Sequence, residues 1–258
     1  MVTIRHSNKF GWKRSLPDYR DYKLLHTHAT VAARPSSVDL RPHMPPVWDQ
    51  LSTSSCTGNA AAAAVSYNLI KQGFGNWTPS RLFAYYNARR IEDDTDQDGG
   101  AQIRDVIKGL VEWGIPPETE WAFSEANVLI RPPVTAYADA LNHTVTSYLA
   151  VDQTVDAICT TLAGGEPIVF GFTVYDAFEG DEVAKTGVLN LPTAGESMVG
   201  GHAVVAVGYD DSTQRFLVRN SWGTDWSPSM GGYFTMPYAY LTNRDLADDL
   251  WIIRSIKS

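Results

Sequence analysis

The stretch Asp49–Ile70, DQLSTSSCTGNAAAAAVSYNLI, joins a polar loop to an alanine-rich segment. Ser54 and Ser55 are residue types that favour the N-cap of a helix, and the run Ala60–Ala64 favours helix itself. The sequence therefore predicts a helix that begins close to Cys56. The free N–H groups and positive dipole end of such a helix stabilise an anion, so a thiolate forms more easily there. The alternative is a cysteine that is buried as a small apolar side chain.

Length and charge limit the classes of protein to consider. The chain has 258 residues, which favours two domains or two tightly joined lobes. Its 29 acidic and 21 basic residues give a net charge of -8, which argues against nucleic acid as a partner. The first 22 residues lack the apolar stretch of a secretory signal, and no run is long enough to span a membrane. Cys56 and Cys159 show no sign of pairing, so we expect reduced thiols in a cytoplasmic protein, with export by another route left open.

Residues 1–34 have the composition of an N-terminal arm, with glycine, proline and charged residues throughout. The arm carries the aromatic residues Phe10, Trp12, Tyr19 and Tyr22. These are too many for a disordered tail, so we expect the arm to dock on the rest of the chain. Its histidines, His6, His26 and His28, lack a cluster of further ligands and are interpreted as solvated loop residues rather than metal ligands.

An acidic segment, IEDDTDQDGGAQIRD, occupies residues 91–105. Its acidic residues at Asp94, Asp96, Asp98 and Asp105 follow the outline of a calcium-binding EF-hand loop. The last position is Asp rather than a bidentate Glu, and the flanks do not form a dedicated helix pair. We therefore favour a solvated acidic loop whose glycines let another backbone approach, and we expect no metal, with cation binding as the alternative.

The pattern of apolar residues changes along the chain. Up to residue 131 it is helical, with further helices expected at 79–90 and 102–113. Beyond it, strands are expected at 143–151, 167–175, 202–210, 215–222 and 231–237, and a short helix at 154–162 holds Cys159, which we interpret as buried. The sequence thus predicts an α+β protein in which a helical lobe, 35–131, precedes a β-rich lobe, 132–258. A cleft between the lobes is the default position of a functional site.

Two residues of the β-rich lobe can complete a nucleophilic site with Cys56. His202 lies at the head of an apolar strand after two glycines, and Asn220 follows on the next strand, with Trp222 placed to cover both. Taken singly, each is more often structural than catalytic. Together with a cysteine at a helix N-terminus they give the Cys-His-Asn order of one known catalytic arrangement, in which the histidine activates the thiol and the amide orients the histidine.

Several motifs extend this pattern along the chain. They are VDLRP at 38–42, VWDQ-x5-C at 47–56, DGG at 98–100, GGHAVVAVGY at 200–209 and NSWGTDW at 220–226. With these motifs in this order, the sequence resembles the papain-like cysteine peptidases over most of residues 35–258. The resemblance implies the two-lobed papain-like fold, with a β-barrel-like second lobe and the active-site cleft between the lobes.

The resemblance also implies roles for individual residues. Cys56 is the expected nucleophile, His202 the general base and then acid, Asn220 the orienting residue, and Gln50 with the Cys56 N–H the oxyanion hole. Substrate-binding residues are expected at Gly99, Gly100, Gly201 and Trp222, with the backbone of Gly100 pairing with extended substrate. No cofactor is implied.

The sequence departs from the family pattern around the nucleophile. Thr53 stands where the family usually has a disulfide-forming cysteine, and Thr57 stands where it has an aromatic residue. The missing disulfide agrees with a reducing compartment, and the missing aromatic residue alters the expected wall of the cleft. Only about 34 residues precede the VDLRP motif, so the arm resembles that of short-armed bacterial members rather than a long pro-domain.

The expected function is that of a cysteine endopeptidase acting on peptides or proteins. An acyl-enzyme can also be intercepted by an amine, so peptidyl or acyl transfer is one alternative. A catalytically silent peptide-binding module is the other, and the presence of all four site residues argues against it. We further hypothesise that the arm covers the cleft and damps activity, the alternative being an arm that only packs on the β-rich lobe. The floor of the substrate pocket depends on residues 238–250, whose register the sequence does not fix.

Overall fold

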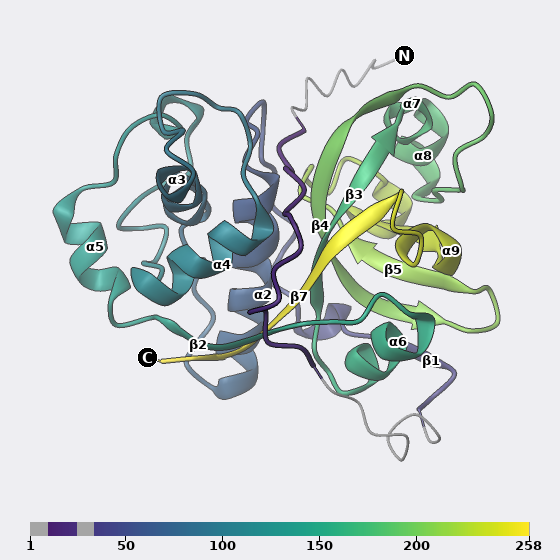
Figure 1. Cartoon of the computed structure of the whole chain (residues 1–258), viewed down its shortest axis with the longest axis horizontal. Coiled ribbons are helices and arrows are strands. Elements are labelled where there is room, and N and C mark those ends of the chain that lie inside the picture. Colours follow the sequence, from purple (N-terminus) through teal and green to yellow (C-terminus); the bar gives the residue numbers. More distant parts are fainter. Residues whose placement is uncertain (1–9, 25–33, 258) are drawn as a thin grey trace.

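The structure is a computed structural model that describes residues 10–24 and 34–257. Helices α2 to α5 gather on one side of the molecule and the antiparallel sheet on the other (Figure 1). The arm passes between the two sides, so that residues near the N-terminus lie beside strands near the C-terminus (Figure 1). No helix in the described residues is long and apolar enough to cross a membrane. The histidines assigned to solvated loops, His6, His26 and His28, lie outside the described residues.

Helix α2 (Cys56–Gln72) begins at the cysteine, as the sequence predicts. Ser55 occupies the N-cap position, although its hydroxyl does not cap the helix. The helix ends at Gly73, whose left-handed backbone (φ 77°) closes the last turn. Residues 56–69 are all buried, so α2 is enclosed on every side. Small side chains suit such a helix because they let neighbouring elements approach its backbone closely.

The remaining helices match the predictions where they are long. α3 (Arg81–Ile91), α4 (Ile103–Glu112) and α6 (Val155–Ala163) fall within one or two residues of the expected bounds. The sequence pattern did not predict the shorter helices α5 (Val134–Ala140), α7 (Asp176–Glu179), α8 (Asp181–Thr186) and α9 (Tyr238–Leu241). Single 3-10 turns lie at Arg41–His43, Glu125–Asn127 and Pro228–Met230. One or two turns offer too little periodicity to be recognised from sequence.

The described strands form one antiparallel sheet. They are β1 (Ser37–Asp39), β2 (Val145–Ala150), β3 (Ile168–Tyr175), β4 (Met198–Asp210), β5 (Arg215–Arg219), β6 (Tyr233–Pro237) and β7 (Ala247–Ile256). Their order is β2-β7-β3-β4-β5-β6, and β1 pairs with β4. The α+β, two-lobed papain-like architecture is confirmed, but the sheet is open and is not closed as a barrel, which corrects the expected barrel-like lobe. Strand β7 was not predicted, although it pairs with both β2 and β3.

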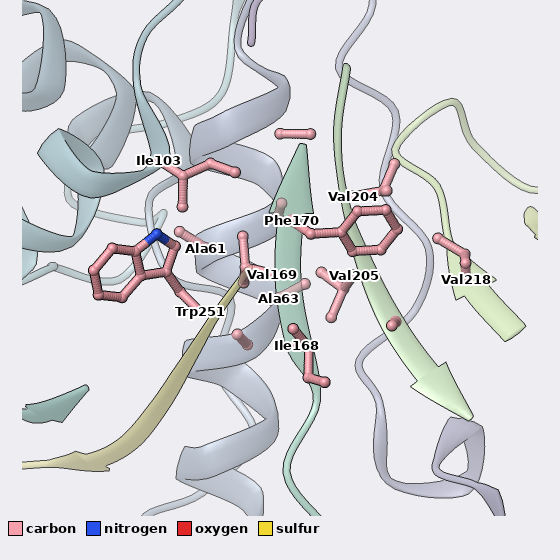
Figure 2. Close-up of a cluster of buried hydrophobic side chains, with 14 of the residues drawn as sticks. Ala61, Ala63, Ile103, Ile168, Val169, Phe170, Val204, Val205, Val218 and Trp251 are labelled. Carbon is pink, nitrogen blue, oxygen red and sulfur yellow. The ribbon is translucent and has the colours of Figure 1, made fainter. Parts of the chain in front are cut away.

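The core lies where α2 meets this sheet. Figure 2 shows Ala61 and Ala63 of α2 close to Val169 of β3 and Val205 of β4. These side chains are at most 1% exposed, and Trp251 of β7 and Ile103 of α4 close the same cluster (Figure 2). Packing α2 against the sheet fixes the helix that begins at Cys56 relative to the strand that carries His202.

The glycine at position 58 is the tightest contact between α2 and α3. A Cβ atom there would lie 2.5 Å from the Arg81 carbonyl oxygen and 2.8 Å from Tyr85 Cβ. We expect Gly58→Ala to lower the free energy of unfolding by about 1–3 kcal/mol, because the two helices must separate to admit the methyl group. The measurement is urea denaturation followed by circular dichroism.

Gly109→Ala in α4 is the matched control. Its new Cβ would have its nearest neighbour at 3.4 Å, an ordinary contact. Alanine is favoured over glycine in a helix, so this variant should be as stable as wild type or up to about 1 kcal/mol more stable. Equal destabilisation by both substitutions would contradict the close-packing explanation.

Candidate active site

The loop before Cys56 is held by its own hydroxyl groups. Thr53 Oγ1 donates to the Gln50 carbonyl oxygen at 2.7 Å and lies 2.6 Å from Ser55 Oγ. Asn59 of α2 donates to Ser55 Oγ and to the Ser55 carbonyl oxygen, each at 3.0 Å. Thr53 thus contributes hydrogen bonds at the position where the family usually has a disulfide. The loop reaches α2 in one defined conformation without a covalent cross-link.

Ser221 joins this loop to the β-rich lobe. Its carbonyl oxygen accepts from the Gln50 backbone N–H at 2.8 Å, and its hydroxyl donates to Gln50 Oε1 at 2.7 Å. Gln50 Nε2 donates to the Thr53 carbonyl oxygen at 2.8 Å, and the Gln50 side chain is fully buried. The carboxamide is therefore oriented from both lobes. Ser221 was not predicted as a site residue, although it lies within the NSWGTDW motif.

Asn220 fixes the orientation and tautomer of His202. Asn220 Oδ1 accepts from the Ser221 backbone N–H at 2.8 Å and lies 2.8 Å from His202 Nε2. Because the backbone N–H can only donate, the atom facing both groups is the amide oxygen, and His202 Nε2 carries the proton. Nδ1 of the neutral ring is then an acceptor. Within the described residues Nδ1 has no hydrogen-bond partner.

Aromatic rings surround His202. The ring centroids of Trp222, Phe172, Phe10 and Phe178 lie 5.0, 5.9, 6.2 and 6.3 Å from that of the imidazole. Burial in this cage lowers the pKa of His202 to about 4, and the hydrogen bond to Asn220 opposes that shift. Trp222 therefore covers the histidine and asparagine as expected, whereas Phe172 and Phe178 gave no recognisable signal in the sequence.

Cys56 is completely buried at the N-terminus of α2. Its thiol lies against the backbone N–H groups of Ala203, Gly11 and Thr57, the first of which follows His202 in the chain. Burial nevertheless raises the pKa of Cys56 to about 11, and these N–H groups oppose the shift. The N-terminus of α2 favours the thiolate, but in this structure burial disfavours it more strongly.

Part of that burial comes from the N-terminal arm. The Trp12 backbone N–H donates to the Gly201 carbonyl oxygen at 2.9 Å, and the Lys13 N–H donates to the Ala101 carbonyl oxygen at 3.1 Å. The Ala101 N–H donates to the Gly11 carbonyl oxygen at 2.8 Å. The arm thereby bridges the helical lobe and strand β4 (Figure 1). The Gly11 backbone N–H of the arm lies beside the Cys56 thiol.

The glycines named as substrate-binding candidates lie along this path. Gly100 has a left-handed backbone (φ 86°), and a Cβ atom there would lie 2.3 Å from the Gly11 carbonyl oxygen. A Cβ atom at Gly201 would lie 2.6 Å from the Trp12 carbonyl oxygen. Gly99 does not face the arm backbone in the same way. The atom nearest to a Cβ placed there would be Asp94 Oδ2, at 3.2 Å. The glycines at 100 and 201 therefore allow a second backbone to approach, and here that backbone is the arm.

Two of the four aromatic residues of the arm pack against the rest of the chain. Trp12 is 9% exposed and Phe10 contacts His202 and Trp222, whereas Tyr19 is 98% exposed and Tyr22 is 71% exposed. The two tyrosines are thus exposed to solvent. They lie where the arm is held by backbone and charged contacts instead, such as Arg104 to Asp21 at 2.6 Å.

The acidic loop binds neighbouring protein groups. Asp98 accepts from the Ser54 backbone N–H at 3.0 Å and from the Tyr85 hydroxyl at 2.8 Å. Asp94 accepts from Lys13 Nζ of the arm at 2.8 Å. Within the described residues no group of three or more His, Cys, Asp or Glu side chains is arranged to hold a metal ion. Asp94 and Asp98 therefore bind the arm and the cysteine loop, which differs from the expected solvated loop. Gly100 admits a second backbone, as expected of the glycines of this loop.

Cys159 lies apart from this site in α6. It is buried and unpaired with Cys56, and both cysteines are free thiols. Burial raises the pKa of Cys159 to about 11, which the nearby Arg34 opposes. This agrees with the interpretation of Cys159 as a buried side chain.

Comparisons with known proteins agree with the fold and show the family. Residues 34–248 match the model of the papain family cysteine proteases. The chain is 37% identical, over 99% of its length and 90% of the relative, to the uncharacterized peptidase C1-like protein L477 of Acanthamoeba polyphaga mimivirus. It is 32% identical, over 80% of its length and 70% of the relative, to the cathepsin B-like CP3 of Giardia intestinalis.

Among solved structures, the chain is similar to Xylellain, a cysteine protease from Xylella fastidiosa. The two have a TM-score of 0.90 and 39% identity, with 99% of each chain covered. The class defined by fold and site is thus that of the cysteine proteases. The chain belongs to the papain family of that class.

The hydrogen bond between His202 and Asn220 predicts which nitrogen of the neutral imidazole carries the proton. We expect nitrogen NMR of the neutral ring to show the proton on Nε2, and Asn220→Ala to populate both tautomers. The variant should also lose about 1–3 kcal/mol of folding free energy, because a buried N–H loses its acceptor. An unchanged tautomer in the variant would show that another group fixes the ring.

Proposed function

We propose that the chain is an endopeptidase that works through a Cys56 thioester and is held inactive by its own N-terminal arm. The observation that carries the first part is the hydrogen bond of 2.8 Å between Asn220 Oδ1 and His202 Nε2. It leaves Nδ1 as a proton acceptor in the same buried site as the Cys56 thiol, which contacts the N–H of the next residue, Ala203. Gln50 is oriented by Ser221 and Thr53 beside the same loop.

The proposed reaction moves one proton back and forth. Cys56 Sγ gives its proton to His202 Nδ1, and the thiolate attacks the carbonyl carbon of a peptide bond. The Gln50 carboxamide and the Cys56 backbone N–H stabilise the oxyanion. The imidazolium then protonates the leaving amine, the C–N bond breaks and a thioester remains. Water, deprotonated by His202, attacks the thioester and regenerates the thiol.

Asn220 acts in this scheme as a positioning residue. Its Oδ1 atom holds the Nε2 proton, so the ring cannot present its protonated nitrogen to the thiol. The same oxygen is fixed by the Ser221 N–H, which ties the histidine to the segment that orients Gln50. The base and the oxyanion donor are thus supported by neighbouring residues of one strand end.

When the arm covers the cleft, the Cys56 thiolate and the His202 imidazolium that this chemistry needs are both disfavoured. With the pKa of Cys56 raised to about 11 and that of His202 lowered to about 4, both groups are neutral near pH 7. Both shifts have burial as their largest cause, so access of water to the cleft should reduce them. Removal of the arm would therefore expose the thiol and also favour its ionisation.

Charged contacts hold the arm in addition to its backbone hydrogen bonds. Lys13 Nζ lies 3.0 Å from Glu92 and 2.8 Å from Asp94, and Arg104 donates to the Leu16 carbonyl oxygen at 2.6 Å. The Trp12 ring is 9% exposed and packs against Gly171 and Gly201 of the sheet, and burial of a tryptophan contributes several kcal/mol. Trp12 is thus the main apolar anchor of the arm.

Two substitutions test the peptidase itself. Cys56→Ala should abolish hydrolysis of a peptide library, because no other side chain in the scheme forms the thioester. Gln50→Ala should lower kcat about 100-fold or more, since one oxyanion donor is lost. Steady-state kinetics and mass spectrometry of the acyl-enzyme check both. Full activity of Cys56→Ala would refute the proposed chemistry.

Trp12→Ala tests the role of the arm. The loss of about 3 kcal/mol of packing energy should lower the equilibrium constant for docking of the arm by about 100-fold. Peptide turnover should rise accordingly. The pH at which iodoacetamide alkylates Cys56 should be lower than in wild type, because the entry of water lowers the raised pKa of this thiol. Cys159 serves as an internal reference. Tyr19→Ala, in the same arm but 98% exposed, is the matched control and should behave as wild type. Equal turnover by all three proteins would leave the arm as a mere packing element.

A further inference from the structure

Arg81, the first residue of α3, has a buried side chain that takes no part in the reaction proposed above. It is only 7% exposed, and its Nε and Nη2 atoms donate to the Glu118 carboxylate at 2.8 and 3.3 Å. Its guanidinium carbon lies 3.9 Å from the ring centroid of Phe123 and 5.3 Å from that of Trp48. Because the donors of a guanidinium lie in one rigid plane, these contacts hold the whole group in one orientation.

The remaining nitrogen of Arg81 faces the loop that precedes Cys56 and the start of α2. Nη1 donates to the Asp49 carbonyl oxygen and to Asn59 Oδ1, each at 3.1 Å. Nη1 carries two hydrogens, so each acceptor takes one of them. Asp49 immediately precedes Gln50, and Asn59 lies three residues after Cys56 in α2. One side chain of α3 thus binds the backbone before Gln50 and the helix that begins at Cys56.

The donor at Arg81 determines how the Asn59 amide is turned. A guanidinium can only donate, so the Asn59 atom that faces it is the amide oxygen. Asn59 Nδ2 then donates to the Ser55 carbonyl oxygen and to Ser55 Oγ, each at 3.0 Å. The Ser55 carbonyl and the Cys56 N–H belong to one planar peptide group and point in opposite directions. Holding this carbonyl therefore aims the Cys56 N–H, one of the two proposed oxyanion donors.

The hydroxyl groups of the loop continue the chain in the same direction. Thr53 Oγ1 uses its hydrogen on the Gln50 carbonyl oxygen at 2.7 Å, so Ser55 is the donor in the 2.6 Å contact between the two hydroxyl groups. Ser55 Oγ in turn accepts from Asn59 Nδ2. Every hydrogen bond from Arg81 to the Gln50 carbonyl oxygen thus runs one way. Hydrogen bonds aligned in such a chain strengthen one another.

We infer that Arg81 is a positioning residue for the oxyanion hole and that it acts through this hydrogen-bond chain rather than by contact with substrate. The inference rests on the proposed function. The Gln50 carboxamide and the Cys56 N–H stabilise an oxyanion only when both aim at the same point, and a small misplacement of such donors lowers the rate strongly. Arg81 orients the peptide groups on which both donors depend, without a disulfide at Thr53.

The test compares Arg81→Met with its parent, the full-length protein carrying Trp12→Ala, so that docking of the arm does not affect the comparison. Methionine keeps an unbranched side chain and removes every donor. For the best peptide of a fluorogenic library, we expect kcat to fall about 10- to 100-fold and KM to change less than about twofold. The donors act mainly in the transition state, which is why kcat carries the effect.

Arg215→Met, in the same parent, is the matched control. Arg215 of β5 is also an arginine held by several hydrogen bonds, but its partners include Thr235 and Leu189 rather than residues of the loop before Cys56. This variant should keep kcat within about twofold of the parent. The comparison separates the loss of this particular chain from the loss of any well-bonded arginine.

Two reagents distinguish positioning of the oxyanion hole from a general disturbance of Cys56. A peptide aldehyde adds to the thiol and places its former carbonyl oxygen in the oxyanion hole, so its inhibition constant should rise in Arg81→Met about as much as kcat/KM falls. Iodoacetamide alkylates the thiol without forming an oxyanion, so the alkylation rate of Cys56 should change less than about twofold. In a Gln50→Ala background, Arg81→Met should lower kcat less than about threefold further, because one of the donors that it positions is already absent.

Substitutions at Thr53 test the same chain if Arg81→Met does not fold, which thermal unfolding shows. Thr53→Val keeps nearly the same shape but breaks the chain at its last hydrogen bond, so kcat should fall about tenfold with little change in KM. Thr53→Ser retains the hydroxyl and should restore kcat to within about threefold of the parent.

The results distinguish failure of this inference from failure of the proposed function. An unchanged kcat in folded Arg81→Met, or in Thr53→Val if Arg81→Met is unfolded, would overturn the role of Arg81. A fall in kcat that is matched by an equal fall in the alkylation rate of Cys56 would overturn it as well. Absence of peptide cleavage and of aldehyde inhibition in the parent protein would instead refute the peptidase on which the inference rests.

Discussion

The close packing of helix α2 against the sheet is the constraint on which the site depends. The alanines of α2 are nearly unexposed, and they bring the helix backbone against β3 and β4 (Figure 2). Because Cys56 is the first residue of that helix and His202 lies on β4, this packing sets the thiol against the strand that carries the histidine. Larger side chains on α2 would separate the two lobes and with them the two halves of the site.

Hydrogen bonds at Ser221 orient the side chains of the site within this packed arrangement. One short segment holds the Gln50 carboxamide, and the same segment fixes the Asn220 oxygen that binds His202. Groups supplied by the two lobes are thus joined directly, without a disulfide at Thr53. Such a network is sensitive to loss of a single member, since a buried polar group without a partner is costly.

Burial has opposite consequences for structure and for the proposed chemistry. The aromatic cage and the arm keep water away from Cys56 and His202, and this exclusion disfavours both the thiolate and the imidazolium. The same exclusion strengthens the hydrogen bonds that orient the two residues. A removable cover reconciles these effects, because it keeps the groups positioned while it suppresses their ionisation. In the proposed function the arm is this cover, and it is held by backbone hydrogen bonds as well as by Trp12.

The sequence alone determined the parts that depend on local pattern or on ordered motifs. The start of a helix at Cys56 and the helical and β-rich halves followed from alanine content and periodicity, because these act over a few neighbouring residues. The family followed from the resemblance carried by five motifs in a fixed order. The open sheet, strand β7 and the linking role of Ser221 required tertiary structure, since they depend on pairing between distant segments. The same holds for the hydrogen bond from the Trp12 indole N–H to Asp249 of β7, which joins residues 237 positions apart in the chain. Burial of Cys56 likewise reversed the effect of its helix terminus, because the energy of ionisation depends on everything packed around the thiol and not on the helix alone.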